Sequence, residues 1–177
     1  MPRSELDLNP VQHITADAIG QPGHRVFYLQ GWRADDITPV TIIIEKIQLQ
    51  TLATGLQQML VEIFRQNPAL AGSKVAYDAD KMHISPPVDP LFRAGEMGLG
   101  YDAEQDQIVI MVREIVAEDG DPEDASVVRF WCTRQQADWL ATWSAEVVKR
   151  GRPICPQCGQ PMEPEGHFCP KKNGHKH

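Results

Sequence analysis

Twice along this chain, a run of strand-forming residues gives way to an amphipathic helix. Residues 40–44 read Val-Thr-Ile-Ile-Ile, and β-branched residues favour extended strands. From residue 46 to residue 66, apolar residues instead recur three or four positions apart, which indicates a helix with one buried face. The same change occurs between residues 125–132 and the helical stretch that runs to residue 149. Such a chain must pack two helices against a sheet.

Three strands are expected before each helix. They cover residues 11–19, 24–32 and 40–44 in the first half, and 91–101, 107–116 and 125–132 in the second half. A short strand at residues 75–77 is compatible with the loop-rich sequence between the halves, and residues 1–10 read as an ordered or semi-ordered arm. The fold class is therefore α+β, with a mostly antiparallel sheet covered by two helices.

The repeated order of three strands and a helix suggests an internal duplication, with repeats at residues 11–66 and 91–150. The tripeptide Leu-Ala-Thr, which begins at Leu52 in the first helix, recurs at Leu140 in the second, an offset of 88 residues. A three-residue identity is a weak signal by itself. Two similar folding units that arose independently explain the same pattern.

Local signals set the boundaries of several elements. Pro22 and Gly23 suit the two central positions of a type II turn, because proline presets φ and glycine accepts a positive φ, so a hairpin is expected there. Thr133 and Gln136 have the spacing of a capping box at the start of the second helix. Gly151 is expected to end that helix.

Three of the four cysteines crowd into the C-terminal segment, as Cys155, Cys158 and Cys169, whereas Cys132 lies alone in an apolar strand. This clustering favours metal ligation in a reducing compartment over a disulfide framework. A redox Cys-x-x-Cys site needs a thioredoxin-like strand–helix context, and the sequence around residues 155–158 does not provide one. The metal expected is zinc, held by thiolates in a tight knuckle.

A histidine must supply the fourth ligand, and two compete. His167 lies two residues before Cys169, so both side chains point the same way if the segment is extended. His175 lies beyond an Asn-Gly turn that could fold it back. Either gives a closed Cys₃His site, which is structural in character, and residues 154–175 are not expected to fold without the metal.

Charge divides the chain into an acidic body, residues 1–150, and a basic zinc-knuckle tail, residues 151–177. The net charge is −7, which disfavours non-specific nucleic-acid binding by the whole chain. From residue 149 onward, however, six Lys/Arg and two Glu give +4, which leaves −11 on the rest. No apolar run approaches the ~20 residues of a membrane span, and the first ten residues are polar, so the expected location is cytoplasmic.

The chain resembles a bacterial family known as domain of unknown function 3090. The resemblance implies a cytoplasmic protein with a zinc-binding tail and modestly favours His167 as the fourth ligand, but it implies no activity. The similar segments are Gly20–Gly23 with Arg25–Gln30, Ile44–Lys46, Phe92–Gly95 with Gly98–Asp102, Gly151–Pro153, Cys155–Cys158, Gly166–Pro170 and Asn173–Gly174.

The function expected from these features is that of a non-catalytic binding or scaffold protein with a structural zinc site. Its partner would be a protein, or an RNA contacted through the basic tail. The alternative is an enzyme with a small-molecule pocket between the two halves of the body and a zinc that is only structural. Its candidate polar groups are Arg25, Glu45, Arg93 and Glu114.

Overall fold

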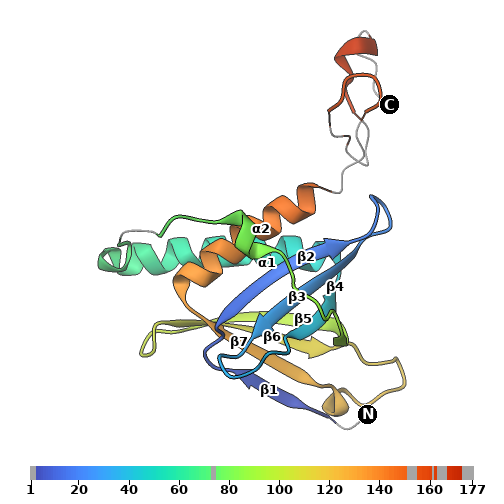
Figure 1. Ribbon diagram of the computed structural model, residues 1–177. Helices are drawn as coiled ribbons and strands as arrows, with labels where there is room; N and C mark the ends of the chain where they lie inside the picture. Colours follow the sequence, from blue (N-terminus) through green and yellow to red (C-terminus); the bar gives the residue numbers. More distant parts are fainter. Residues whose placement is uncertain (1–2, 73–74, 151–154, 161, 163–166, 173–177) are drawn as a thin grey trace.

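The computed structural model describes residues 3–72, 75–150, 155–160, 162 and 167–172. The two halves of the body have the same order of elements, three strands followed by a helix (Figure 1). The first half contains β2 (His13–Ile19), β3 (Val26–Trp32), β4 (Val40–Ile44) and α1 (Lys46–Gln66). The second half contains β5 (Pro90–Asp102), β6 (Gln107–Glu114), β7 (Val127–Cys132) and α2 (Arg134–Lys149). The prediction of an α+β fold with two helices is confirmed.

An additional strand, β1 (Glu5–Leu8), lies where the sequence suggested only an arm. It pairs in parallel with β7, and the seven strands form one sheet in the order β1-β7-β6-β5-β4-β3-β2. The only other parallel pair in the described sheet joins β4 to β5, so the sheet is mostly antiparallel, as expected.

The chain between β1 and β2 bridges the two ends of this sheet. These strands are consecutive in sequence but lie at opposite ends of the strand order, and the sheet curves strongly between them (Figure 1). The main-chain N–H of Val11 donates to the carbonyl of Trp131 at 2.8 Å, and that of Gln12 donates to the carbonyl of Trp32 at 2.8 Å. Two adjacent residues therefore contact both β7 and β3.

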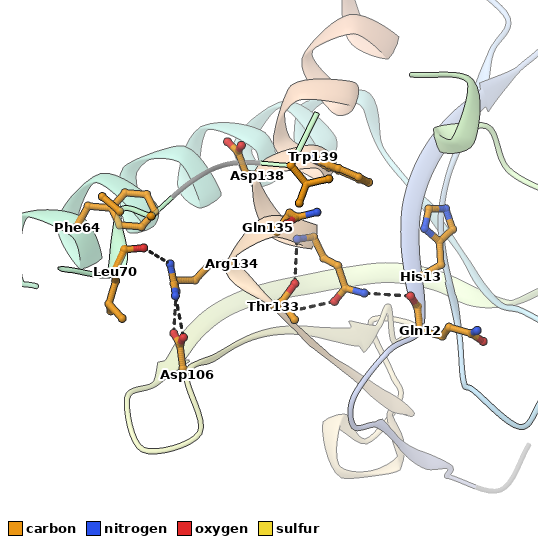
Figure 2. Close-up of a pocket in the computed structure, with 14 residues that line it drawn as sticks. Gln12, His13, Phe64, Leu70, Asp106, Thr133, Arg134, Gln135, Asp138 and Trp139 are labelled. Atoms are coloured by element: carbon orange, nitrogen blue, oxygen red, sulfur yellow. Dashed lines mark hydrogen bonds and ion pairs between the residues drawn. The ribbon is translucent and has the colours of Figure 1, made fainter. Parts of the chain in front are cut away.

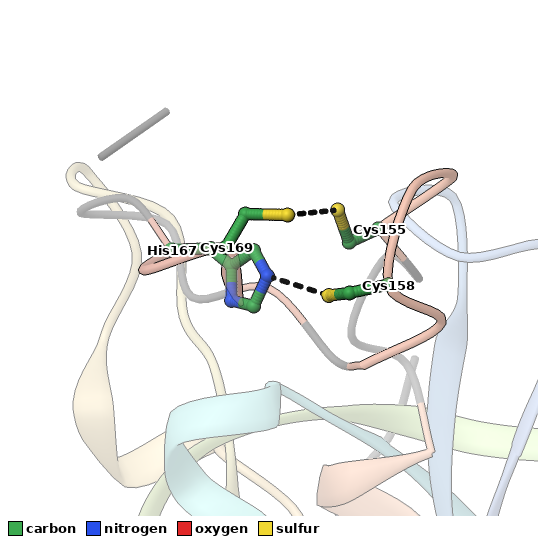
Figure 3. A group of neighbouring side chains, drawn as sticks. All are labelled: Cys155, Cys158, His167 and Cys169. Carbon is green, nitrogen blue, oxygen red and sulfur yellow. Dashed lines mark hydrogen bonds between the residues drawn. The ribbon is translucent and has the colours of Figure 1, made fainter. Parts of the chain in front are cut away.

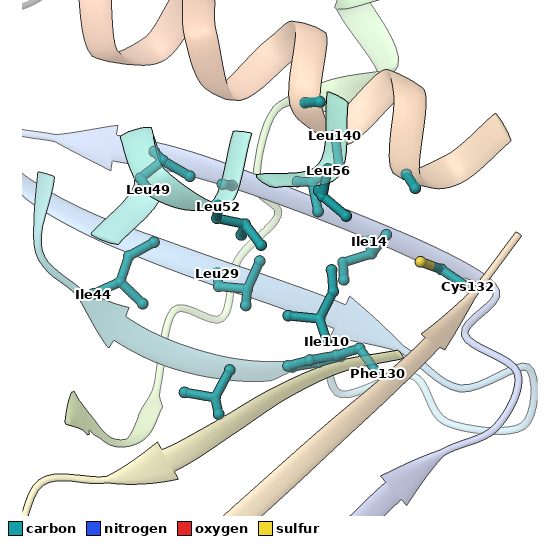
Figure 4. Packing of buried hydrophobic residues seen from close by; sticks show 14 of the residues in the cluster. Ile14, Leu29, Ile44, Leu49, Leu52, Leu56, Ile110, Phe130, Cys132 and Leu140 are labelled. Carbon is teal, nitrogen blue, oxygen red and sulfur yellow. The ribbon is translucent and has the colours of Figure 1, made fainter. Parts of the chain in front are cut away.

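Both helices cover one face of the sheet, and the core lies between the helices and that face (Figures 1 and 4). Leu49 and Leu56 of α1 and Leu140 and Trp143 of α2 are completely buried. They share one apolar cluster with buried strand residues such as Leu29, Ile44, Ile110 and Phe130. Burying each of these large apolar side chains contributes about 1.5–3 kcal/mol, so this face is the main source of the body's stability.

The predicted turn between β2 and β3 is present. Gly23 has φ +86°, and the N–H of His24 donates to the carbonyl of Gln21 at 2.8 Å, which closes the turn with Pro22 and Gly23 at its centre. The two strands that it joins pair antiparallel. The boundaries predicted for β4 and α1 also agree with the structure.

Two local predictions are wrong or displaced. Residues 75–77 form no strand in the described chain. Helix α2 ends at Lys149 with Arg150 as its C-cap, one residue earlier than the glycine cap expected at position 151, which lies outside the described residues. No helix in the described ranges has the length and apolarity needed to cross a membrane.

Candidate metal centre and body cavity

The tight turn at residues 155–160 brings two cysteines to the same side of the backbone. The N–H of Gly159 donates to the carbonyl of Cys155 at 2.9 Å, and the N–H of Cys155 donates to the carbonyl of Gln160 at 2.8 Å. Gly159 adopts φ +73°, a left-handed conformation that glycine accepts without steric cost. The glycine after the second cysteine is therefore needed for the backbone to reverse at this point.

Cys155, Cys158, His167 and Cys169 form one cluster, with one potential ligand atom of each within 4.8 Å of all the others (Figure 3). The sulfurs of Cys155 and Cys169 lie 3.9 Å apart, and Nε2 of His167 lies 3.1 Å from the sulfur of Cys158. Cys155 and Cys169 are buried although they lie in a short segment, because each sulfur faces the other members of the cluster. His175, the competing histidine, lies outside the described residues.

The donor set and its dimensions fit a tetrahedral zinc ion. Zinc binds thiolate at about 2.3 Å and imidazole nitrogen at about 2.0–2.1 Å, so tetrahedral ligand atoms lie roughly 3.5–3.8 Å apart. The measured separations of 3.1 and 3.9 Å bracket that range. Three soft sulfur donors and one imidazole favour thiophilic metal ions, of which zinc is one, over oxygen-preferring cations such as magnesium or calcium. The four residues can hold a metal ion.

Main-chain amides prepare one thiol for metal binding. The N–H groups of Cys158 and Gln157 donate to the sulfur of Cys155 and lower the pKa of that thiol to about 6. At Cys158, a hydrogen bond from the main-chain N–H of Gln160 also lowers the pKa of the thiol. Burial and the neighbouring thiols of Cys155 and Cys169 raise it by more, so the pKa of Cys158 lies above its usual value. Cys132 differs from both, because burial in the apolar core raises its pKa to about 12 and it lies in β7. It is a core residue, as its sequence context predicted.

A cavity of about 790 Å³ lies in the body, between the end of the first half and the start of α2 (Figure 2). Its polar groups include Arg134, which makes two hydrogen bonds to the carboxylate of Asp106, at 2.8 and 2.9 Å. Arg134 also donates to the carbonyl of Leu70 at 2.7 Å, and the hydroxyl of Tyr101 donates to Asp106 at 2.8 Å. Hydrogen bonding from the Arg134 guanidinium lowers the pKa of Asp106 below its usual value.

Aromatic and amide side chains line the rest of this cavity. The guanidinium of Arg134 lies 5.7 Å from the ring centre of Phe64, and Trp139 faces the cavity from the first turns of α2. His13 lies on the opposite wall, where burial lowers its pKa. A volume of this size and a mixed lining are typical of small-molecule sites. The described lining residues include no serine or cysteine nucleophile beside a base.

The family described as "Protein of unknown function (DUF3090)" matches residues 6–169, which is most of the chain. The chain belongs to this family. No curated protein and no solved structure matches it significantly. The match extends over the body and to the last cysteine of the cluster, so the DUF3090 family includes the segment that carries the potential metal ligands.

The four polar residues that the sequence suggested for a pocket in this DUF3090 protein do not converge on one pocket, although two of them pair with each other. Arg93 and Glu45 form an ion pair of 2.6 Å, with both side chains about half exposed. Arg25 donates to the carbonyl of Val147 at 2.9 Å near the end of α2. Glu114 accepts the N–H of Ser126. None of the four suggested residues lines either of the two described cavities.

The sequence did not indicate Arg134 and Asp106 as cavity residues, because they are 28 residues apart and neither belongs to a recognisable motif. Asp106 is the one described non-glycine residue with a positive φ, 51°, in the tight turn between β5 and β6. An aspartate in such a turn is an ordinary sequence feature. Only the folded sheet brings this turn to the start of α2.

A second, smaller hollow of about 420 Å³ lies at the start of α1. It is bounded by Gln48, Thr51 and Gly55 of α1 and by Met97 and Leu99 of β5. Its position beside the first turns of a helix matches that of the larger cavity beside α2. Its walls are mainly apolar, however, and the described lining includes no charged side chain.

Proposed function

We propose that this protein is a non-catalytic binding protein in which a structural zinc ion holds the C-terminal knuckle folded as a contact surface. The observation that carries this proposal is the convergence of four ligand atoms of suitable chemistry within 4.8 Å of one another. Cys155, Cys158, His167 and Cys169 would hold the ion, with Nε2 as the ligand atom of the histidine. Zinc would supply the cohesion that so short a segment cannot obtain from an apolar core.

A structural role suits this site better than a catalytic one. Four protein ligands fill a tetrahedral coordination sphere, whereas catalytic zinc sites keep one position open for water or substrate. The main-chain amides directed at the sulfur of Cys155 stabilise its negative charge, as outer hydrogen bonds do in structural thiolate sites. The knuckle would therefore act through the shape and charge of its surface.

The partner proposed is a macromolecule in the cytoplasm: a protein, or an RNA contacted through the basic tail. Support comes from the contrast between a net charge of −11 on residues 1–148 and a net charge of +4 from residue 149 to the end. A basic appendage on an acidic body attracts acidic surfaces to the appendage and disfavours binding elsewhere on the chain. The body would then act as a scaffold that carries the knuckle.

The metal is tested by elemental analysis of the purified protein. We expect about one zinc per chain, and loss of that zinc in Cys158→Ser, because serine does not replace a thiolate ligand. Cys132→Ala is the matched control, since Cys132 is buried in the body and should not affect the metal content. Zinc retained in full by Cys158→Ser would contradict the site.

The binding role is tested by deleting residues 152–177. Affinity purification of the intact chain from its native host, followed by mass spectrometry, identifies what co-purifies with it. We expect the shortened chain to stay folded and to lose that partner. A partner retained by the shortened chain would place the contact on the body and contradict a binding role for the knuckle.

One observation favours the alternative, a small-molecule enzyme: the 790 Å³ cavity lies between the two halves of the body, where the sequence placed a pocket. Its polar groups would be Arg134, Asp106 and His13 in place of the four suggested from sequence. Screening metabolites by thermal shift tests this alternative, with Trp139→Ala as the variant expected to lose any stabilisation. A catalytic role would further require turnover of the ligand so identified.

A further inference from the structure

Phe168 is an exposed aromatic residue fixed between two members of the metal cluster. Its side chain is 66% exposed, whereas Cys169 is fully buried. Phe168 lies in extended backbone, where successive side chains point to opposite sides. Because His167 and Cys169 both turn toward the other sulfurs, the ring between them must point outward.

Metal ligation of the residues on both sides would fix the main chain at Phe168, so less conformational entropy remains to be lost when the exposed ring contacts a partner. Large apolar side chains are exposed elsewhere in the described structure, for example Ile37, which is 96% exposed in the loop before β4. Ile37, however, has no cluster of potential metal ligands around it.

Cationic residues follow Phe168 in the sequence. Lys171, three residues further on, is exposed, Lys172 comes next, and the chain from residue 149 to the end carries a net charge of +4. A flat aromatic ring beside positive charge is the combination that binds single-stranded nucleic acids, because every base stacks on an aromatic face and every phosphate attracts a cation. Zinc knuckles are among the modules that bind unpaired bases in this way.

We propose that Phe168 is a stacking platform for an unpaired base of a single-stranded nucleic acid, and that Lys171 contacts the adjacent phosphate. This inference rests on the proposed function, since the ring is held outward only when the metal folds the knuckle. A nucleic acid fits better than a protein for a reason of size. A stable protein interface buries about 1,200 Å² or more, whereas one base needs only one ring.

The acidic body limits how such a strand is bound. With −11 on the rest of the chain, a long strand is repelled wherever it leaves the tail. The bound stretch of the strand is therefore short, a few nucleotides. A duplex should not bind to the ring of Phe168, because its bases are already stacked on one another. Binding should weaken with salt, with a small slope set by the few phosphates that are contacted.

The test is fluorescence anisotropy of the full-length, zinc-containing protein with fluorescein-labelled twelve-nucleotide oligo-U and oligo-A RNA, the matching DNA strands, and an RNA duplex. We expect binding of single strands, little binding of the duplex, and a loss of about tenfold in affinity for Phe168→Ala, the range found for one stacked base. Comparison of the RNA and DNA strands shows which sugar is preferred. Phe168→Tyr should retain binding, and Lys171→Gln should weaken it with a smaller salt slope.

Ile37→Ala is the control for loss of an exposed apolar side chain and should bind like the unmodified protein. Zinc content is measured for every variant, so failure of the metal site is distinguished from failure of this inference. A protein with full zinc that binds none of the single strands at low salt would overturn the inference and leave the structural zinc proposal standing. Unchanged affinity in zinc-loaded Phe168→Ala would overturn it equally.

Discussion

Gln48 and Gln136 make the same hydrogen bonds at the starts of α1 and α2. Each side-chain oxygen accepts the main-chain N–H of the N-cap residue, at 2.8 Å in α1 and 2.9 Å in α2. Each side-chain nitrogen lies within hydrogen-bonding range of two consecutive main-chain carbonyls, those of residues 94–95 for Gln48 and residues 11–12 for Gln136. Each glutamine therefore caps its helix and attaches it to a neighbouring segment.

The two segments contacted in this way occupy matching places in the sheet. Residues 94–95 belong to β5, which begins in parallel beside β4, the strand that leads into α1. Residues 11–12 follow β1, which lies in parallel beside β7, the strand that leads into α2. The offset of 88 residues that aligns the two Leu-Ala-Thr tripeptides also aligns the two glutamines. This agreement is what an internal duplication predicts, and the duplication stays a hypothesis.

Replacing either glutamine by alanine should destabilise the body by a similar amount. Gln48→Ala and Gln136→Ala each remove a capping interaction and leave main-chain groups with fewer partners, so each should lower the free energy of unfolding by about 1 kcal/mol. Urea denaturation followed by circular dichroism measures this. Gln57→Ala, at an exposed position of α1, is the control and should change little. An effect at one glutamine and none at the other would contradict their equivalence.

The ion pair between Arg134 and Asp106 should make stability depend on pH at the acidic end. Because Arg134 lowers the pKa of Asp106 in the folded protein, this carboxylate stabilises the fold above the unfolded pKa of about 3.9, and the contribution is lost as pH falls through the folded pKa. Asp106→Asn should therefore cost about 1 kcal/mol at pH 7, a value limited by the partial exposure of the pair.

The difference in stability between Asp106→Asn and the unmodified protein should then begin to shrink below about pH 4, where the carboxylate of the unfolded chain is protonated first, and should vanish below the lower pKa of the folded protein. Urea titrations at pH 7, 5 and 3.5 measure it, and Asp102→Asn, in the same turn but outside the ion pair, serves as a comparison. A difference that is constant across this range would show that the charge of Asp106 is not what stabilises the turn.

The sequence predicted those parts of the fold that depend on local pattern. Residues 40–44 and 46–66 have strong strand and helix periodicity, and their boundaries are confirmed. The three clustered cysteines lie within 15 positions, so spacing alone was sufficient to group them, but it left the fourth ligand open between His167 and His175. In such cases the physical signal and the structure that it specifies lie in the same short segment.

What the sequence did not show depends on contacts between distant segments. Residues 5–8 alternate charged with apolar side chains, as a half-buried strand does, but four positions are too few to distinguish a strand from an arm; pairing with β7 decides it. Glu45 caps α1, a position where serine, threonine, aspartate and asparagine are the usual signals. The cavity beside α2 is likewise assembled from distant segments, such as those of Asp106 and Arg134, which are 28 residues apart.

Because β3 and β7 are in close contact, a single methyl group added at Gly31 of β3 should lower the stability of the protein. A Cβ at Gly31 would lie 2.7 Å from two ring carbons of Phe130, which is fully buried. Gly31→Ala should therefore force the ring or the strand to move, at a cost of about 1–3 kcal/mol. Gly72→Ala, where an added Cβ meets no atom within 4 Å, is the matched control and should be close to neutral. Thermal unfolding compares the two, and equal melting temperatures would contradict the close packing.

Removal of the metal should unfold the knuckle and leave the body intact. The apolar cluster of the body ends at Val148 and includes neither Cys155 nor Cys169, so among the described residues the two parts do not share a core. With a strong chelator, we expect the NMR amide signals of residues 155–172 to lose their dispersion. The melting temperature of the body should change by less than about 2 °C, which for a body of this size corresponds to under about 1 kcal/mol. Re-addition of zinc should restore the dispersed signals, because folding of the segment and binding of the metal are one equilibrium. Simultaneous loss of body and knuckle signals would instead show that the metal supports the whole fold, and the knuckle would then be part of the body and not a separate contact surface.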